Sequence, residues 1–131
     1  MKKTLVFIML LTVSVIGLTA FNQENPIDQE ELGRLLFSDP ILSKDKTVSC
    51  ASCHIPDYAF ADTSAVSLGV GGKKGDRNTP SAMNLLLNTS FFWDGRAKTL
   101  EEQSLAPIAN PSEMNLPVDK AVERLKSSKK Y

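Results

Sequence analysis

The chain has 131 residues, of which 42% are hydrophobic and 23% are charged, and its 15 basic and 15 acidic side chains give a formal net charge of 0. This length leaves room for one domain with one modest core. Because the charges are balanced and largely interspersed, the chain lacks the basic surface that nucleic-acid binding requires, and we expect no nucleic-acid partner.

Residues 1–20 have the pattern of an export signal peptide: two lysines near the start, a largely apolar stretch, and small residues at the end. An uncleaved membrane anchor is the alternative, because Leu18 suits a cleavage site poorly. The apolar run is, however, shorter than the roughly 20 residues that cross a bilayer. We therefore expect a periplasmic protein whose mature part is residues 21–131.

The first element expected after this leader is an amphipathic helix. Asp28 to Glu31 resemble a capping box, and leucines then recur at helical spacing up to Phe37, where we expect the helix to end. Turn-forming residues follow, so the next segment is expected to be a loop.

Residues 50–54 read Cys-Ala-Ser-Cys-His, the pattern in which two thiols attach a c-type haem and the adjacent histidine binds its iron. The spacing has a physical reason, because one short helical turn directs Cys50, Cys53 and His54 toward the same side. A covalent haem also fills the core and staples a small exported domain. The sequence therefore predicts one haem c, bound through these three residues.

Three other uses of the cysteine pair are less favoured. A disulfide between residues only three positions apart closes almost no loop and stabilises little. A zinc site would want two further Cys or His ligands, and the sequence contains no others. A thioredoxin-like centre would need a preceding strand, whereas residues 38–43 resemble a turn.

The remaining elements are predicted from glycine, proline and capping residues. Residues 64–78 hold four glycines and form a long loop. Three helices follow, one opened by Thr79-Pro80, one capped by Thr99 and ending before Pro107, and one beginning near Pro117. Their expected buried positions are Met83, Leu86 and Leu87 in the first and Val118, Val122 and Leu125 in the last. No alternating strand pattern reaches four residues outside the leader, so the fold class is all-α with long loops.

Five stretches of this sequence, in order, resemble the bacterial di-haem cytochrome c peroxidases and the related methylamine-utilisation enzymes. The resemblance covers nearly all of residues 21–131. The stretches are LGRLLFSDP at 32–40, SCASCH at 49–54, GDRNTP at 75–80, FWDGRA at 92–97, and LEEQ at 100–103 followed by PIANPSEM at 107–114. The resemblance implies a cytochrome c-like haem domain, the N-terminal one of the family, where hydrogen peroxide is reduced to water.

The resemblance also implies roles for single residues. Glu113 is similar to the distal acid and base that helps to break the O–O bond, and Gln103 to its polar companion. Trp93 matches a tryptophan between the two haems of the family, an electron conduit. Asn78 matches a residue that helps to bind a structural calcium, for which an amide oxygen is a suitable ligand. Family members are often homodimers and take electrons from a small cytochrome or copper protein.

This sequence departs from the family in two respects. Val70 stands where many of these enzymes have a distal histidine, and His54 is the only histidine, so we expect resting iron that is five-coordinate or water-bound. Met83 and Met114 are candidate sixth ligands, but the first is expected in the core and the second follows Glu113. The second haem domain of the family is missing, so we expect residues 21–131 to be a truncated enzyme whose turnover alone is doubtful. The alternative function is a mono-haem electron-transfer cytochrome with strong ligands on both faces of the iron.

Overall fold

The computed structural model describes residues 27–131, and the predicted signal peptide lies outside them. The described chain is helical, and its backbone pairing outside helices is limited to isolated bridges, which confirms the all-α prediction for this part. In chain order the helices and single 3-10 turns (η) are α2 (Gln29–Ser38), η2 (Pro40–Leu42), α3 (Cys50–Cys53), η3 (Pro56–Tyr58), η4 (Val70–Gly72), η5 (Leu85–Leu87), α4 (Leu100–Ala109) and α5 (Val118–Lys126).

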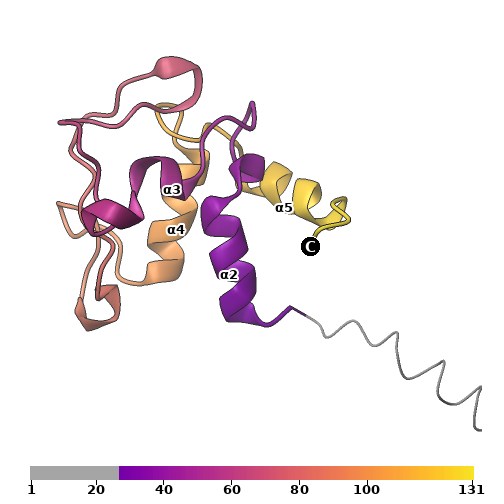
Figure 1. The fold of residues 1–131 in the computed structure, drawn as a ribbon, viewed down its shortest axis with the longest axis horizontal. Helices are drawn as coiled ribbons and strands as arrows, with labels where there is room; N and C mark the ends of the chain where they lie inside the picture. Colours follow the sequence, from indigo (N-terminus) through magenta and orange to yellow (C-terminus); the bar gives the residue numbers. More distant parts are fainter. Residues whose placement is uncertain (1–26) are drawn as a thin grey trace, which may run out of the picture.

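Helix α2 begins and ends as the sequence predicts. The Asp28 carboxylate accepts a 2.8 Å hydrogen bond from the Glu31 N–H, which satisfies one of the free donors at the helix start. The helix ends at Ser38, just before an Asp-Pro pair. Helix α3 packs against α2, and α5 contacts both η2 and α4, so the four helices gather around the middle of the molecule (Figure 1).

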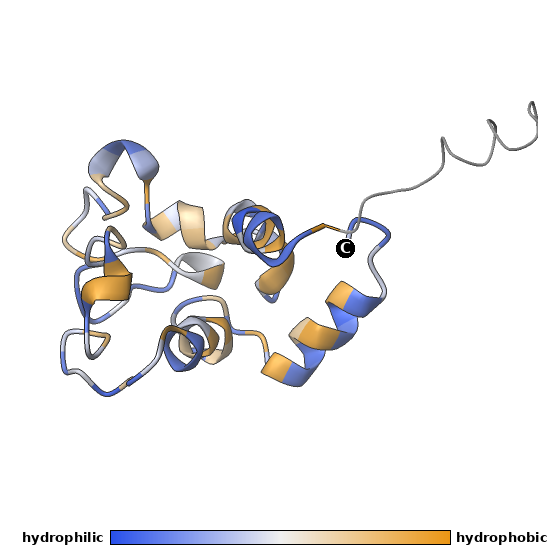
Figure 2. Ribbon diagram, turned by 90° about the horizontal axis from the view of Figure 1, so that it is seen from below, coloured by the Kyte–Doolittle hydropathy of each residue, from blue (hydrophilic) through white to orange (hydrophobic). Residues whose placement is uncertain are grey.

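The core lies where segments distant in sequence meet. It is formed by buried side chains from four regions, namely Leu42, Val48, Val70, Met114, Leu116 and Ala121. Helix α5 contributes Ala121, with Val118 and Leu125 half-buried on the same face, whereas Val122 is 45% exposed and its predicted burial was wrong. Val122, at i+4 from Val118, lies at the edge of this apolar stripe, where its side chain is left partly open to solvent. The hydrophobic residues of α5 accordingly form one stripe (Figure 2).

The predicted helix after Thr79-Pro80 is wrong. Only the single turn η5 forms, and Leu86 and Leu87, expected in the core, are 89% and 83% exposed. Met83 is also exposed. The physical reason is that Asn84 adopts a left-handed conformation, with φ of 55°, which an α-helix cannot contain.

Helix α4 also differs from the prediction at its end. It begins after Thr99, whose hydroxyl accepts the Glu102 N–H at 3.2 Å, but it continues through Pro107 to Ala109. Because Pro107 lies in the last turn, it costs the helix a single backbone hydrogen bond. The helix therefore continues past Pro107 instead of ending before it. The turn after it is held by the Asn110 N–H, which donates to the Ala106 carbonyl at 3.0 Å.

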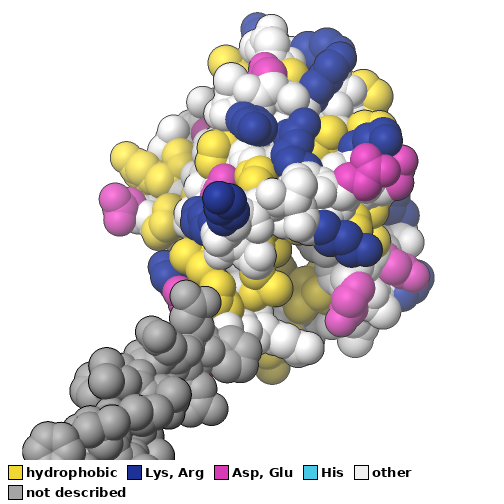
Figure 3. Space-filling view, turned by 90° about the vertical axis from the view of Figure 1, so that its right-hand side faces the viewer, with side chains coloured by type: hydrophobic (Ala, Val, Ile, Leu, Met, Phe, Trp, Pro, Cys, Tyr) yellow, Lys and Arg dark blue, Asp and Glu magenta, His cyan; other side chains and the backbone are white. Residues whose placement is uncertain are grey.

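The surface of the described part carries charges of both signs without a large field of either. One face shows Lys, Arg, Asp and Glu side chains interspersed around a hollow with hydrophobic side chains (Figure 3). Within residues 27–131, no helix has both the length and the apolar character needed to cross a membrane.

Candidate haem site and its surroundings

The two cysteines and the histidine lie on one short turn. The His54 backbone N–H donates to the Cys50 carbonyl at 2.8 Å, which closes the turn that carries all three residues. Both thiols are free and half-buried. Burial raises the pKa of Cys50 and of Cys53, so both thiols stay protonated at neutral pH. For Cys53, a hydrogen bond with Ser67 partly opposes that rise.

The His54 ring is held in one orientation by its neighbours. Its Nδ1 lies 2.9 Å from the carbonyl oxygen of Phe60, and because a carbonyl can only accept, Nδ1 carries the proton and donates. The Nε2 atom then keeps its lone pair for a metal. The Phe37 ring packs against His54, with a centroid separation of 6.2 Å, and meets the Phe60 ring edge-on at 6.0 Å.

The loop that supplies the Phe60 carbonyl has an uncommon backbone. Ala59 and Phe60 are both left-handed, with φ of 55°, although neither is glycine. The Ile55 N–H donates to the Ala61 carbonyl at 3.1 Å and closes this loop directly after the haem motif. Sequence reasoning did not identify Phe60, because nothing in the residue types marks two consecutive left-handed positions.

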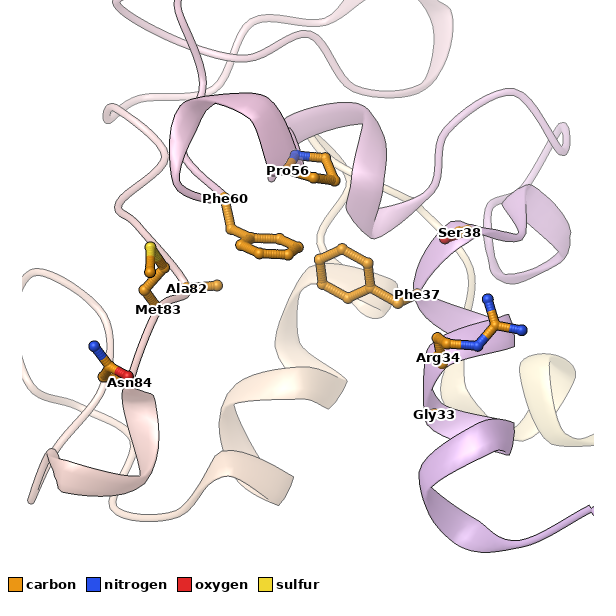
Figure 4. Close-up of a pocket in the computed structure, with 9 residues that line it drawn as sticks. All are labelled: Gly33, Arg34, Phe37, Ser38, Pro56, Phe60, Ala82, Met83 and Asn84. Atoms are coloured by element: carbon orange, nitrogen blue, oxygen red, sulfur yellow. The ribbon is translucent and has the colours of Figure 1, made fainter.

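A cavity of about 670 Å³ opens beside these aromatic rings. Phe37 from α2 and Phe60 from the loop after η3 point toward one another, and Ala82 and Met83 line the cavity from the segment before η5 (Figure 4). Its walls are mainly apolar, as is usual for sites that hold an aromatic cofactor. Two thiols, an imidazole with a free Nε2 and an adjacent apolar cavity together fit a c-type haem.

Glu113 is fixed at the end of a tight turn. The Asn110 side-chain amide donates to Glu113 Oε1 at 2.7 Å, and the Asn110 carbonyl accepts the Glu113 N–H at 3.0 Å. Burial raises the pKa of Glu113, and the Asn110 hydrogen bond and the nearby charge of Arg96 partly oppose that rise. Glu113 is in turn one of the charges that raise the pKa of Cys53, next to His54 in the chain. Asn110 was not predicted as a site residue, although an Asn-Pro pair three positions before the acid is a turn signal.

The segment around Val70 packs against the backbone of Glu113. The Val70 N–H donates to the Glu113 carbonyl at 2.8 Å, and the Val70 side chain is buried in the core. A Cβ atom on Gly69 would overlap the Ser112 carbonyl and would come within 2.7 Å of Glu113 Cα. Only glycine therefore permits this close approach.

The other predicted site residues lie in two places. Gln103 is half-buried on α4, one turn before Pro107, whose carbonyl accepts the Met114 N–H at 3.1 Å. Trp93 is 64% exposed, and its indole N–H donates to the Asn78 carbonyl at 2.8 Å. Trp93 and Asn78 are therefore neighbours in the structure.

The surroundings of Asn78 bear on the predicted calcium. The Asn78 side-chain amide nitrogen donates to the Ser64 carbonyl at 2.9 Å, so its oxygen keeps its lone pairs. Across residues 27–131, no three His, Cys, Asp or Glu side chains gather closely enough to hold a metal ion.

A helical domain with an attachment turn of this geometry defines a cytochrome c-like haem domain. The family model described as di-haem cytochrome c peroxidase matches residues 27–131, and the chain belongs to that family. Members of this family bind c-type haem. The chain is 45% identical over 109 residues to the methylamine utilization protein MauG of Methylorubrum extorquens, covering 82% of this chain and 31% of that protein. It is 47% identical over 87 residues to the cytochrome c551 peroxidase of Pseudomonas aeruginosa, covering 66% and 25% respectively.

Solved structures agree with this assignment. A MauG-like protein associated with microbial copper homeostasis has a TM-score of 0.70 and 37% identity, covering 82% of this chain and 33% of that one. The di-haem peroxidase BthA of Burkholderia thailandensis has a TM-score of 0.69 and 32% identity, covering 75% and 29%. The chain thus spans about a third or less of the length of these relatives.

Proposed function

We propose that residues 21–131 form an exported, peroxide-reacting haem domain of the cytochrome c peroxidase type. Cys50 and Cys53 would hold one haem c through thioether bonds, and His54 would bind its iron through Nε2. The His54 Nε2, the two free thiols on the same turn and the apolar cavity support this assignment. The haem would supply the iron at which peroxide binds, and the two electrons for its reduction would come from the donor protein by way of the haem.

The observation that carries the peroxidase proposal is the position of Glu113. Its carboxyl group is half-buried, is held by Asn110, and is one of the charges that raise the pKa of Cys53 on the attachment turn. A carboxylate there takes the first proton of hydrogen peroxide and returns it to the oxygen that leaves as water. Burial raises the pKa of Glu113 and makes the group a stronger base than an exposed glutamate.

Further roles follow from family membership. Gln103 would orient peroxide beside Glu113, Trp93 would conduct electrons, and Asn78 would contribute an oxygen to a calcium site. The electron donor would be a small cytochrome or copper protein, and the functional unit would be a homodimer. The signal-like residues 1–20 support export to the periplasm.

The alternative is a mono-haem electron-transfer cytochrome. Such a carrier needs a second strong ligand to the iron, and methionine is the usual one besides histidine. Val70, at the place of the family's distal histidine, is buried and cannot ligate. Met114 packs in the core, and exposed Met83 lines the cavity, so Met83 is the candidate for a carrier.

The test is peroxide reduction by the haem-loaded chain with a reduced small cytochrome as donor. We expect high-spin ferric iron in the absorption and EPR spectra, and donor oxidation that falls by about 10²-fold or more in Glu113→Gln, the usual size of a general acid–base effect. Glu30→Gln, an exposed acid in the first turn of α2, is the matched control and should retain activity. A purely low-spin spectrum lost in Met83→Ala would favour the carrier.

A further inference from the structure

The carbonyl oxygen of Phe60 serves two donors. It accepts the Nδ1–H of His54 at 2.9 Å and the backbone N–H of Ala82 at 3.2 Å. The segment around Ala82 is therefore joined to the imidazole through a single oxygen atom. Ala82 and Met83 also form part of the cavity wall (Figure 4).

A serine side chain fastens the same two segments together. The Ser81 hydroxyl donates to the Ala59 carbonyl at 2.5 Å and accepts the Met83 N–H at 3.2 Å. Ser81 thus binds the backbone immediately before Phe60, in the stretch where two consecutive residues are left-handed. A non-glycine residue in that region is strained and persists only where surrounding contacts enforce it.

We propose that Ser81 is a positioning residue for the axial ligand: it holds residues 59 and 60 so that the Phe60 carbonyl meets His54 Nδ1. The inference rests on the proposed function only in taking His54 as the iron ligand. A carbonyl that accepts from Nδ1 makes the imidazole a stronger donor to iron, and so stabilises the oxidised form. Ser81 sets the reduction potential through this bond without touching the haem.

The sign of the effect follows from the geometry. Without the Ser81 hydroxyl, the left-handed residues relax and the Phe60 carbonyl moves away from Nδ1. The imidazole then donates less electron density, so the iron–histidine bond weakens and reduction becomes easier. We expect a threefold increase in the reduction equilibrium constant, about 28 mV for a one-electron couple.

The experiment uses the full haem-loaded chain, with redox titration and resonance Raman spectroscopy of the reduced protein. Ser81→Ala should raise the midpoint potential and lower the iron–histidine stretching frequency. Ser81→Thr keeps the hydroxyl and should behave as the wild type, whereas Ser81→Val, of nearly the same volume, should behave as Ser81→Ala. Ser127→Ala is the matched control, because the Ser127 hydroxyl also donates to a backbone carbonyl, that of Arg124 at 3.0 Å.

The outcomes separate this inference from the function on which it rests. Equal potentials and stretching frequencies in the Thr and Val variants would overturn the role of Ser81 while leaving His54 as the ligand. Absence of any iron–histidine band in the wild type would instead overturn the assignment of His54. If Ser81→Ala fails to take up haem, the Thr and Val pair still decides, since failure of Val alone supports the positioning role and failure of both overturns it.

Discussion

Asn110 holds Glu113 twice, with its side-chain amide 2.7 Å from Glu113 Oε1 and its carbonyl 3.0 Å from the Glu113 N–H. The first of these bonds stabilises the ionised carboxylate and so lowers its pKa against the opposing effect of burial. One neighbour therefore sets both the place and the charge state of the proposed acid and base.

Replacing Asn110 with alanine should move the pH dependence of the peroxide reaction. Loss of the donor leaves burial to dominate, so the pKa of Glu113 rises further and less of it is ionised at a given pH. The acidic limb of the rate should shift to higher pH, measured by rapid mixing of the ferric protein with peroxide. Asn88→Ala, at an exposed position, should leave the limb unchanged. If the acidic limb of the pH–rate profile does not shift in Asn110→Ala, Glu113 does not take part in the proton transfer.

Gly69→Ala should destabilise the haem-loaded protein by about 1–3 kcal/mol, because the new methyl group must displace the backbone of Ser112 and Glu113. Gly75→Ala is the matched control. An added Cβ on Gly75 would meet its nearest atom, the Ser67 carbonyl oxygen, at an ordinary 3.6 Å, so alanine there should leave the free energy of unfolding unchanged or raise it by up to about 1 kcal/mol. Denaturant unfolding compares the two, and equal effects would contradict the close approach at Gly69.

Arg124 fastens α5 to η2 and to the residue that follows it. Its guanidinium donates to the Ile41 carbonyl at 2.8 Å and to the Ser43 carbonyl at 2.6 Å. Arg124→Ala should lower the free energy of unfolding by about 1.5–3 kcal/mol, the usual range for hydrogen bonds to charged groups. Lys120→Ala, also on α5, removes only an exposed ion pair with Glu123 and should have no measurable effect. Equal losses in the two variants would show that the Arg124 contacts do not form.

The two methionines considered as iron ligands should differ sharply in their contribution to stability. Met114 is 3% exposed in the core, so Met114→Ala should cost about 2–5 kcal/mol. Met83 is 52% exposed, so Met83→Ala should cost less than about 1 kcal/mol. Thermal unfolding of the haem-loaded variants checks this contrast, and a large cost at Met83 would show that its side chain packs on or binds the haem.

Asp39 should make the fold sensitive to acid. Its pKa lies below the ordinary value of 3.8, mainly because Lys130 donates to it and also because the Ile41 N–H does. A carboxylate with a lowered pKa stabilises the fold above 3.8, and that stability is lost as pH falls below it. Asp39→Asn should flatten the fall in unfolding free energy over this acid range. A fall as steep as that of the wild type would assign the acid sensitivity to other groups.

Features that depend on neighbouring residues could be predicted from the sequence. The Asp28 cap, the turn that carries Cys50 to His54, and the start of α5 after Pro117 all follow from contacts within a few positions. Each of these signals is local, so tertiary packing left it in place.

Features that depend on distant segments could not be predicted. Met83, Leu86 and Leu87 have helical spacing, yet Ser81 and Ala82 bond to residues 59 and 60 and leave those apolar side chains outside. The orientation of His54 likewise depends on a carbonyl whose left-handed backbone has no signature in residue type. His54 could be proposed as the iron ligand from the sequence, but the contacts that orient it could not be predicted.

Pro107 gives α4 a property that an unbroken helix lacks. It has no N–H, so the carbonyl of Gln103, four residues earlier, loses its usual partner within the helix. A half-buried carbonyl without that partner is a natural place for an ordered water molecule. Gln103 would then be hydrated through its main chain as well as its side chain, and α4 would carry a point of solvent exchange beside the turn that holds Glu113.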